Sequence, residues 1–231
     1  MARPFLCIGH RGAMGHEPEN TLRSIRKGIE LGATWIEIDV QRVEEQLVVF
    51  HDERLDRTTN GRGLLAEQSF AELRKLDAGR GERIPTLEEV FETIGERVGL
   101  NIELKGPETA EPTVRRIHAR DDFDYKRLLV SSFDIPQLRR VHELDAEIPL
   151  AGLYSRPSKE ALRTATALGF LAINVSLRHV TSEFVKAAHE QGLQVLVYTV
   201  NEPDDIARMM SLGVDGVFSD YPDRVLRASR K

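Results

Sequence analysis

Residues 29–39 read IELGATWIEID, in which a mixed polar and apolar segment ends at Gly32 and an alternating apolar run begins at Trp35. Glycine often closes a helix, because it adopts the left-handed backbone conformation without a steric penalty. Alternation of apolar and polar residues after such a glycine indicates a strand. The stretch therefore predicts a helix that is followed at once by a strand.

The same pattern recurs four more times along the chain. It reads ERVGLNIELK at 96–105, TALGFLAINVS at 166–176, HEQGLQVLVYTV at 189–200 and MMSLGVDGVFSD at 209–220. We expect the glycine of each junction to take the left-handed conformation that closes a helix. These glycines are Gly32, Gly99, Gly169, Gly192 and Gly213.

Eight strands are predicted, with room for a helix between most neighbours. They fall near residues 5–8, 35–40, 100–104, 128–132, 149–153, 171–175, 194–199 and 214–218. Eight strand and helix units favour an α/β protein with a closed (β/α)8 TIM barrel. An open doubly wound sheet also alternates strands and helices, but no G-x-G-x-x-G fingerprint opens the first helix.

A ninth apolar run, LVVF at 47–50, follows the predicted strand at 35–40 too closely for a crossover helix. It is expected to return as a hairpin partner, so that His51 lies over the carboxyl ends of the barrel strands. Residues 52–84 contain the turn sequences TTNGRG and DAGRGER and one short helical pattern, SFAELRKL. We interpret them as an insertion that covers the mouth of the barrel. Pro85 and Thr86 then mark the start of the next helix.

Length and composition favour a single domain over residues 1–231. The 231 residues are 41% hydrophobic and 30% charged, and the formal net charge is −5. This balance gives no electrostatic footprint for nucleic acid or an anionic membrane, and no run of apolar residues is long enough for membrane insertion. A small-molecule ligand is therefore favoured. The single Cys7 excludes an internal disulfide, and we expect a cytoplasmic protein.

Three carboxylates are expected to point into the barrel from neighbouring strands. Side chains alternate along a strand, so Glu37 and Asp39 share the inward face, as do Asn101, Glu103 and Lys105. Buried like charges are costly unless they are neutralised, and carboxylate oxygens suit a hard divalent cation, Mg²⁺ or Ca²⁺ before Zn²⁺. The alternative is that these acids form structural ion pairs with Arg11, Lys105 or Arg42.

Two histidines and two cations are expected at the same end of the barrel. Arg11 and Lys105 suit an anionic group such as a phosphate. His10 ends the first strand and His51 ends the hairpin, and two imidazoles can serve as general base and general acid near neutral pH. We expect His118, His142, His179 and His189 to be ordinary surface residues, and the sequence leaves His16 open.

The loop after the first strand opens a series of motifs that resembles a known family. The motifs are HRGAMGHEPENT at 10–21, EIDVQ, LVVFHDERLDRTTNGRG, PTLEEV, NIELK, SSF, VYTVN and GVDGVFSDYP, and within the first of them Asn20 or Thr21 is the expected helix N-cap. In their order and spacing, from about residue 6 to 224, they resemble the glycerophosphodiester phosphodiesterase family, in its bacterial, cytoplasmic type.

The resemblance implies a metal-dependent barrel enzyme. Its expected reaction is hydrolysis of glycerophosphodiesters, such as glycerophosphocholine or glycerophosphoethanolamine, to sn-glycerol 3-phosphate and an alcohol. The family's ligands for one divalent cation, Mg²⁺ or Ca²⁺ with Mn²⁺ also possible, fall on Glu37, Asp39 and Glu103. Its acid–base pair falls on His10 and His51, and its phosphate contacts fall on Arg11 and Lys105.

Two departures from the family pattern touch the site. The hairpin turn reads VEEQ, about one residue shorter than usual, which bears on the reach of His51. Tyr198 stands where the family often has Trp, which changes the wall of the glycerol pocket that the resemblance implies.

The sequence leaves several alternatives open. The nucleophile is either the glycerol 2-hydroxyl, with a cyclic phosphate as intermediate, or water, and either histidine can act first. A lysophospholipase D-like activity and a barrel that binds glycerophosphodiesters without cleaving them are the competing functions. Headgroup preference and oligomeric state are not specified.

Overall fold

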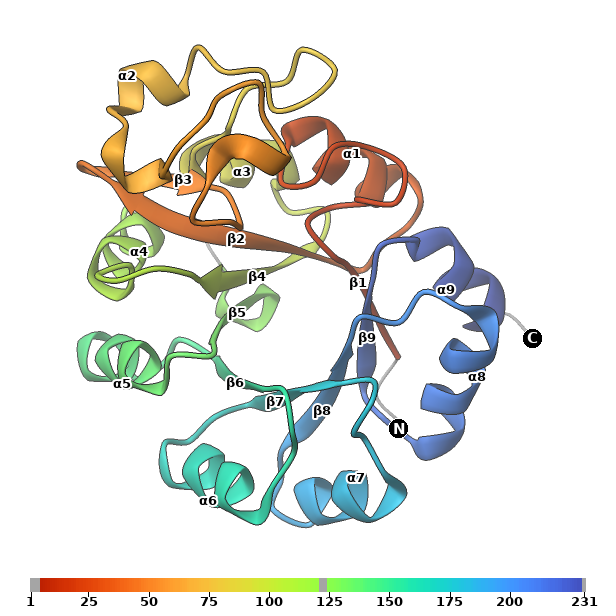
Figure 1. The fold of residues 1–231 in the computed structure, drawn as a ribbon. Coiled ribbons are helices and arrows are strands. Elements are labelled where there is room, and N and C mark those ends of the chain that lie inside the picture. The colour runs from red at the N-terminus through yellow and green to blue at the C-terminus, as the bar shows by residue number, and fades with distance from the viewer. Residues whose placement is uncertain (1–4, 121–123, 230–231) are drawn as a thin grey trace.

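In the residues that the structure describes, the strands form one nine-stranded sheet that closes on itself. The fold is seen in a computed structural model, which describes residues 5–120 and 124–229 (Figure 1). The order around the sheet is β1-β9-β8-β7-β6-β5-β4-β2-β3, and a further pairing of β1 with β2 closes the barrel. Eight of the nine strands run parallel, and β3 alone is antiparallel, to β2. The predicted (β/α)8 TIM barrel is confirmed.

The strand bounds follow the sequence prediction closely. They are β1 (Leu6–Gly9), β2 (Trp35–Val43), β3 (Gln46–Val49), β4 (Gly99–Leu104), β5 (Leu128–Ser132), β6 (Leu150–Tyr154), β7 (Ala172–Ser176), β8 (Gln194–Tyr198) and β9 (Gly216–Ser219). The main difference is β2, which runs to Val43 instead of ending near residue 40. It is longer because β3 returns beside it as the expected hairpin partner, and Val40 pairs with Val49.

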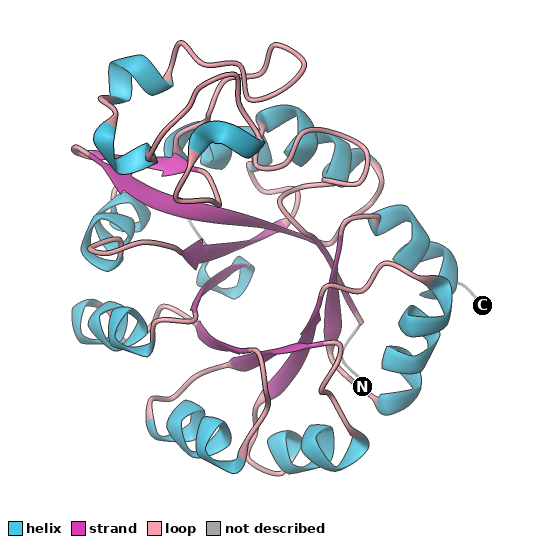
Figure 2. Ribbon diagram, viewed as in Figure 1, coloured by secondary structure: helices cyan, strands magenta, loops and turns pink. Residues whose placement is uncertain are grey.

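Helices surround the barrel on its outside, as Figure 2 shows. Their bounds are α1 (Leu22–Glu30), α3 (Leu87–Ile94), α4 (Ala110–His118), α5 (Ile135–Leu144), α6 (Lys159–Ala167), α7 (Ser182–His189), α8 (Pro203–Leu212) and α9 (Pro222–Ser229), and the short 3-10 helix η3 (Tyr125–Arg127) precedes β5. The start of α3 shows why the sequence marks these ends. The Thr86 hydroxyl accepts from the backbone N–H of Glu89, and the Glu89 carboxylate accepts from that of Thr86.

The glycine prediction holds at four of the five junctions. Gly32, Gly169, Gly192 and Gly213 have φ values of +87°, +66°, +79° and +73°. The prediction for Gly99 is wrong, because α3 ends at Ile94 and Gly95 is the residue that follows it with a positive φ, of +51°. Gly99 instead begins β4, where an added Cβ would lie 2.4 Å from the ring of Trp35. Close packing, not backbone conformation, selects glycine at this position.

Side-chain direction along the strands separates two apolar regions. Ile36, Ile38 and Val40 point outward into the large core between strands and helices, as their parity predicted. A smaller cluster lies inside the barrel. Its members are Ile8, Leu129, Ala151, Ala172, Leu196 and Phe218. The inward positions of β2 that follow Trp35, at Glu37 and Asp39, are therefore left for polar side chains.

The segment between β3 and α3 forms its own small layer beside the hairpin (Figure 1). It contains η1 (Leu55–Arg57), η2 (Leu65–Glu67) and α2 (Phe70–Leu73). The short helical pattern predicted there corresponds to α2. Leu55, Leu65 and Leu73 pack in a separate apolar cluster with Val48 and Phe50 of the hairpin. This cluster anchors the segment to β3, immediately before His51.

In the part of the chain that the structure describes, every helix is too short or too polar to span a bilayer.

Candidate active site

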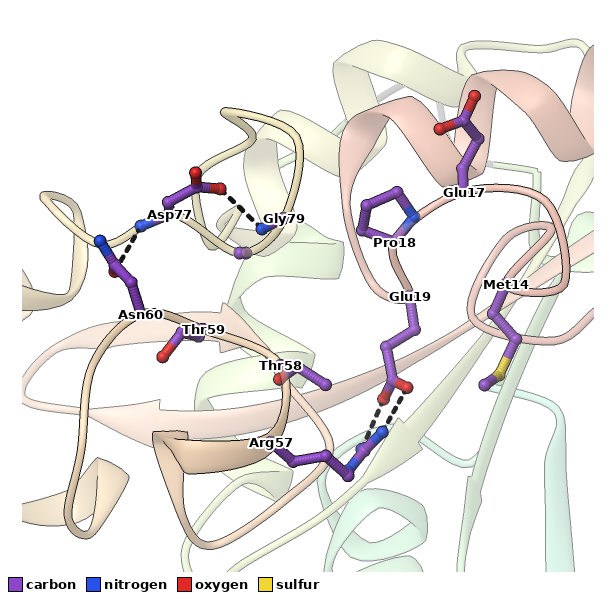
Figure 3. Close-up of a pocket in the computed structure, with 11 residues that line it drawn as sticks. Met14, Glu17, Pro18, Glu19, Arg57, Thr58, Thr59, Asn60, Asp77 and Gly79 are labelled. Atoms are coloured by element: carbon purple, nitrogen blue, oxygen red, sulfur yellow. Dashed lines mark hydrogen bonds and ion pairs between the residues drawn. The ribbon is translucent and has the colours of Figure 1, made fainter.

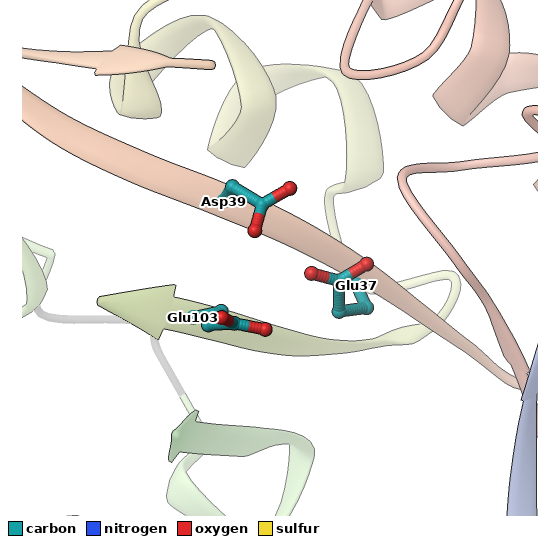
Figure 4. Close-up of side chains that lie close together, drawn as sticks. All are labelled: Glu37, Asp39 and Glu103. Atoms are coloured by element: carbon teal, nitrogen blue, oxygen red, sulfur yellow. The ribbon is translucent and has the colours of Figure 1, made fainter. Parts of the chain in front are cut away.

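The carboxyl ends of the barrel strands, here called the rim, bring three carboxylates together. Glu37 and Asp39 lie on β2, and Glu103 lies opposite Asp39 in the β2–β4 register. Each offers an oxygen that lies within 4.8 Å of the others (Figure 4). Glu37 and Asp39 are 2% and 1% exposed, so this acidic cluster is held away from bulk water. The cluster could bind a metal ion.

The chemistry of the cluster fits a divalent cation. Oxygens that ligate one Ca²⁺ lie about 5 Å apart at most, so the spacing suits a shared ion. Glu37 Oε2 accepts from the backbone N–H of Arg11 at 2.8 Å, whereas Glu37 Oε1 is buried without a partner among the described residues. A buried carboxylate oxygen without a partner is costly, and a bound cation would satisfy it.

Two acids of the cluster resist ionisation in the absence of a cation. Burial raises the pKa of Glu37 well above its ordinary value, and the charges of Asp39 and Glu103 raise it further. Burial also raises the pKa of Glu103 to about 7, with a further contribution from Asp39. The site therefore favours added positive charge.

The alternative of structural ion pairs applies only in part. Arg11 Nε lies 3.2 Å from Asp39 Oδ2, and Lys105 Nζ lies 3.4 Å from Glu103 Oε1. Arg42, by contrast, pairs with Glu45 and Glu108, not with the cluster. The cationic side chains of Arg11 and Lys105 therefore both lie at the rim, where an anionic group bound to a metal would also lie.

The loop over residues 10–21, here called the opening loop, holds Arg11 by its backbone. Arg11 has a φ of +49°, which is uncommon for a residue other than glycine, and this geometry lets its N–H reach Glu37. Thr21, not Asn20, is the N-cap of α1, since its hydroxyl accepts from the N–H of Ser24. Asn20 instead donates its amide to Asp39 Oδ2 at 2.9 Å.

The shorter hairpin turn still brings His51 to the rim. The N–H of Phe50 donates to the carbonyl of Asp39 at 3.0 Å, so His51, the next residue, lies beside the middle of β2, where this strand carries the acidic cluster. His51 Nε2 lies 3.3 Å from Lys105 Nζ. Burial lowers the pKa of His51, and the charge of Asp39 opposes that effect.

Each rim histidine is backed by a carboxylate. His10 Nδ1 lies 2.7 Å from Asp220 Oδ1, and His51 Nδ1 lies 2.6 Å from Asp52 Oδ1. Burial opposes ionisation of Asp220, but the hydrogen bond from His10 keeps its pKa low; hydrogen bonds from Arg57 and His51 hold the pKa of Asp52 well below its usual range. An ionised carboxylate only accepts, so Nδ1–H donates and Nε2 is the nitrogen left for proton transfer.

Sequence reasoning did not single out Asp220 or Asp52. Asp220 directly follows β9, at the carboxyl end of a barrel strand. Because active-site residues of this fold lie at such ends, its position in the sequence could have indicated it. Asp52 directly follows His51 and was visible in the same motif. Of the remaining histidines, His16 pairs with Asp223, His118 with Asp145 and His189 with Asp215. None of these three contacts the acidic cluster.

Tyr198 lies at the end of β8 with its ring edge-to-face against Phe133, at a centroid distance of 6.1 Å. Burial raises the pKa of its hydroxyl to about 12.

A cavity of about 520 Å³ lies between the opening loop and the segment that follows His51. Glu19 and Arg57 line it, and Figure 3 shows them facing each other. Arg11 donates to Glu19, and Arg57 donates to Asp52, so the cavity lies beside the acidic cluster and is connected to it through these side chains.

A closed barrel whose rim holds buried acids, two imidazoles backed by carboxylates and two basic side chains is an arrangement typical of barrel enzymes, whose active sites lie at this end of the fold. The family follows from comparison with known proteins. The family model described as "Glycerophosphoryl diester phosphodiesterase family" matches residues 10–224. The chain belongs to this family, and it is a phosphoric diester hydrolase.

Several relatives extend along nearly the whole chain. The glycerophosphodiester phosphodiesterase of Caldanaerobacter subterraneus subsp. tengcongensis is 36% identical, with 98% of each chain covered. That of Bacillus altitudinis is also 36% identical, over 95% of this chain and 96% of the relative. Among solved structures, a phosphodiesterase of Oleispira antarctica in complex with the product sn-glycerol-3-phosphate has a TM-score of 0.91 and 32% identity, and covers 99% of this chain and 98% of its own.

Proposed function

We propose that the protein hydrolyses glycerophosphodiesters, such as glycerophosphocholine and glycerophosphoethanolamine, to sn-glycerol 3-phosphate and an alcohol, with one divalent cation. The whole chain acts as one phosphodiesterase domain, with residues 52–84 as an insertion. The observation that carries the proposal is the convergence of the acidic cluster with two carboxylate-backed imidazoles at one rim. The product complex of the Oleispira antarctica relative supports the same substrate class.

Glu37, Asp39 and Glu103 would hold the cation, which is Mg²⁺ or Ca²⁺, with Mn²⁺ as a further candidate. When bound, such an ion supplies positive charge to the phosphoryl oxygens. Arg11 and Lys105 contact the same phosphate, Arg11 with a planar fork and Lys105 with a point charge. Their ion pairs with Asp39 and Glu103 support this placement, because both cationic side chains lie beside the carboxylates while Glu37 Oε1 is left without a hydrogen-bond partner among the described residues.

His10 and His51 form the acid–base pair. One imidazole takes the proton of the nucleophile at Nε2, and the other donates a proton from Nε2 to the departing alkoxide. In both rings Nδ1–H donates to the carboxylate, Asp220 or Asp52. The base is therefore the neutral ring with a free Nε2, and the acid is the imidazolium, which carries its second proton at Nε2.

The substrate is a small molecule, and the protein works in the cytoplasm without inserting into a membrane or binding nucleic acid. The net charge of −5 and the single buried Cys7 support this location.

Turnover of glycerophosphocholine in excess EDTA, followed by addition of Mg²⁺, Ca²⁺ or Mn²⁺, tests the proposal. We expect loss of activity in the chelator and recovery with at least one of the three ions. Undiminished turnover in EDTA would contradict metal dependence. A panel that adds ethanolamine, inositol and lysolipid headgroups would then define the preferred substrate.

A further inference from the structure

Arg57, at the end of η1, joins two carboxylates with one guanidinium. Its Nε and Nη2 donate to Asp52 at 2.6 and 3.0 Å, and its Nη1 and Nη2 donate to Glu19 at 2.6 and 2.8 Å. The contact with Glu19 is the paired hydrogen bond drawn in Figure 3. Both contacts are bidentate, which is the arrangement in which arginine fixes the position of its partners most firmly.

Each of these carboxylates holds one residue of the candidate active site. Asp52 Oδ1 lies 2.6 Å from His51 Nδ1, and Glu19 Oε1 accepts from Arg11 Nη1 at 2.7 Å. The resulting chain of contacts runs from His51 through Asp52, Arg57 and Glu19 to Arg11. Arg57 therefore contacts the carboxylate that orients the His51 imidazole. It also contacts the carboxylate that orients the Arg11 guanidinium.

We propose that Arg57 is a positioning residue, which fixes the His51 imidazole through Asp52 and the Arg11 guanidinium through Glu19. The proposal rests on the proposed function, because it assigns Arg57 to the same site. Asp52 lies in a loop and is one-quarter exposed, so a second partner is needed to hold its carboxylate against the imidazole. Without Arg57, Asp52 and Glu19 would face each other as like charges and separate.

The segment after His51 has a second contact with the opening loop, which provides a matched control. Arg80 Nη1 lies 2.5 Å from Glu17 Oε2, and Glu17 also accepts from Arg23. Arg80 is 57% exposed and Arg57 is 49% exposed. Both arginines tie the two loops together, but the contacts of Arg80 do not continue to His51 or Arg11.

Kinetics of Arg57→Ala, Arg57→Lys and Arg80→Ala with glycerophosphocholine and saturating divalent cation test the proposal. We expect Arg57→Ala to lower kcat about 100-fold, since a misplacement of about 1 Å can have that effect. Arg57→Lys should recover little, because an ammonium group cannot bridge both carboxylates. Arg80→Ala should keep kcat within twofold of the native value, and thermal unfolding of all three variants reports any loss of folding.

Chemical rescue separates positioning from simple anchoring. Arg57 lines the open cavity, so its truncation leaves a space that free guanidinium can enter. Millimolar guanidinium should restore part of the kcat of Arg57→Ala. It should have no such effect on Asp52→Ala, which lacks the carboxylate that orients the imidazole. Native kcat in Arg57→Ala, or equal losses in Arg57→Ala and Arg80→Ala without rescue, would overturn the proposal.

An activity-independent measurement keeps this proposal separate from the proposed function. In NMR spectra of protein with ¹⁵N-labelled histidine, Arg57→Ala should shift the ring signals of His51 and leave those of His10 in place. Unchanged His51 signals would contradict the positioning role. If the native protein fails to cleave every glycerophosphodiester, the proposed function fails, and the His51 signals still decide whether Arg57 positions this ring.

Discussion

The two ends of the barrel are built from the same strands, but their inward side chains differ in kind. At the amino ends, here called the base, Ile8, Leu129 and Leu196 pack against one another and line a largely apolar cavity of about 240 Å³. At the rim, the inward positions carry Glu37, Asp39 and Glu103. Apolar burial at the base therefore stabilises the fold, whereas burial of the carboxylates at the rim lowers the free energy of unfolding.

A histidine paired with an aspartate occurs at both ends of the barrel, but the two pairs have different surroundings. His118 pairs with Asp145 at 2.8 Å at the base, much as His10 pairs with Asp220 at 2.7 Å at the rim. His118 is 48% exposed, whereas His10 is 18% exposed. His10 directly follows β1, which pairs with β2, the strand that carries Glu37 and Asp39. The pair alone does not define an acid–base residue. What the second ring nitrogen faces makes the difference.

Removal of a rim histidine should have the largest effect. His10→Ala and His51→Ala should each lower kcat about 10²- to 10⁴-fold, the usual range for general acid–base catalysis. His118→Ala should leave kcat within twofold, because this ring lies at the base. Steady-state kinetics on glycerophosphocholine measures all three variants. Equal effects at rim and base would break the distinction between the two ends.

A cavity at the base should affect stability and not catalysis. Leu196→Ala removes a side chain that is 1% exposed, and we expect it to lower the free energy of unfolding by about 2–5 kcal/mol. The exposed Leu171→Ala should cost much less. Denaturant unfolding measures both changes. A large loss of kcat in folded Leu196→Ala would show that the base also controls the chemistry.

Neutralising the carboxylate behind a rim histidine should have an intermediate effect. Asp220→Asn keeps the size of the side chain but no longer favours Nδ1–H of His10, so kcat should fall, by less than in His10→Ala. Asp145→Asn makes the same change behind His118 and should not alter kcat. Kinetics of the two variants, measured side by side, would sharpen the comparison. A normal kcat in Asp220→Asn would exclude a positioning role for this carboxylate.

The pH dependence of stability should show the charge retained at the rim. Folding raises the pKa of Glu103 from 4.5 to about 7, so in chelator the folded protein keeps a proton that the unfolded chain loses. Its contribution to stability is present below about pH 4.5 and is lost as pH rises through 7. Glu103→Gln should therefore flatten this fall, and raise Tm at pH 8 by a few degrees. Thermal unfolding in EDTA across this range gives the answer, and an unchanged slope in Glu103→Gln would contradict the assignment.

Much of the rim could be predicted from the sequence, because strand parity is a local property. Glu37, Asp39 and Glu103 converge because alternation fixes the face of each side chain once the strands are identified. The position of His51 could be predicted from the hairpin, because a short turn makes the chain return directly beside β2. These inferences need only short-range geometry and the general rule that active sites of this fold lie at the carboxyl ends of the strands.

The site residues that could not be predicted from the sequence are held by contacts between distant segments. Asp220 reaches His10 across 210 residues, because β9 closes the barrel against β1. Arg57 reaches Glu19 because a separate apolar cluster folds the inserted segment beside the opening loop. The error at Gly99 has the same origin, since the glycine accommodates the Trp35 ring of a neighbouring strand. Such partners become visible only when the register and packing are known.

Binding of Mn²⁺ to the metal-free protein, measured by electron paramagnetic resonance of the free ion, tests the central claim most directly. The account predicts one ion per chain in the native protein and loss of that binding in Glu37→Gln, with His118→Ala unchanged. Absence of a bound ion in the native protein, or undiminished binding in Glu37→Gln, would contradict it.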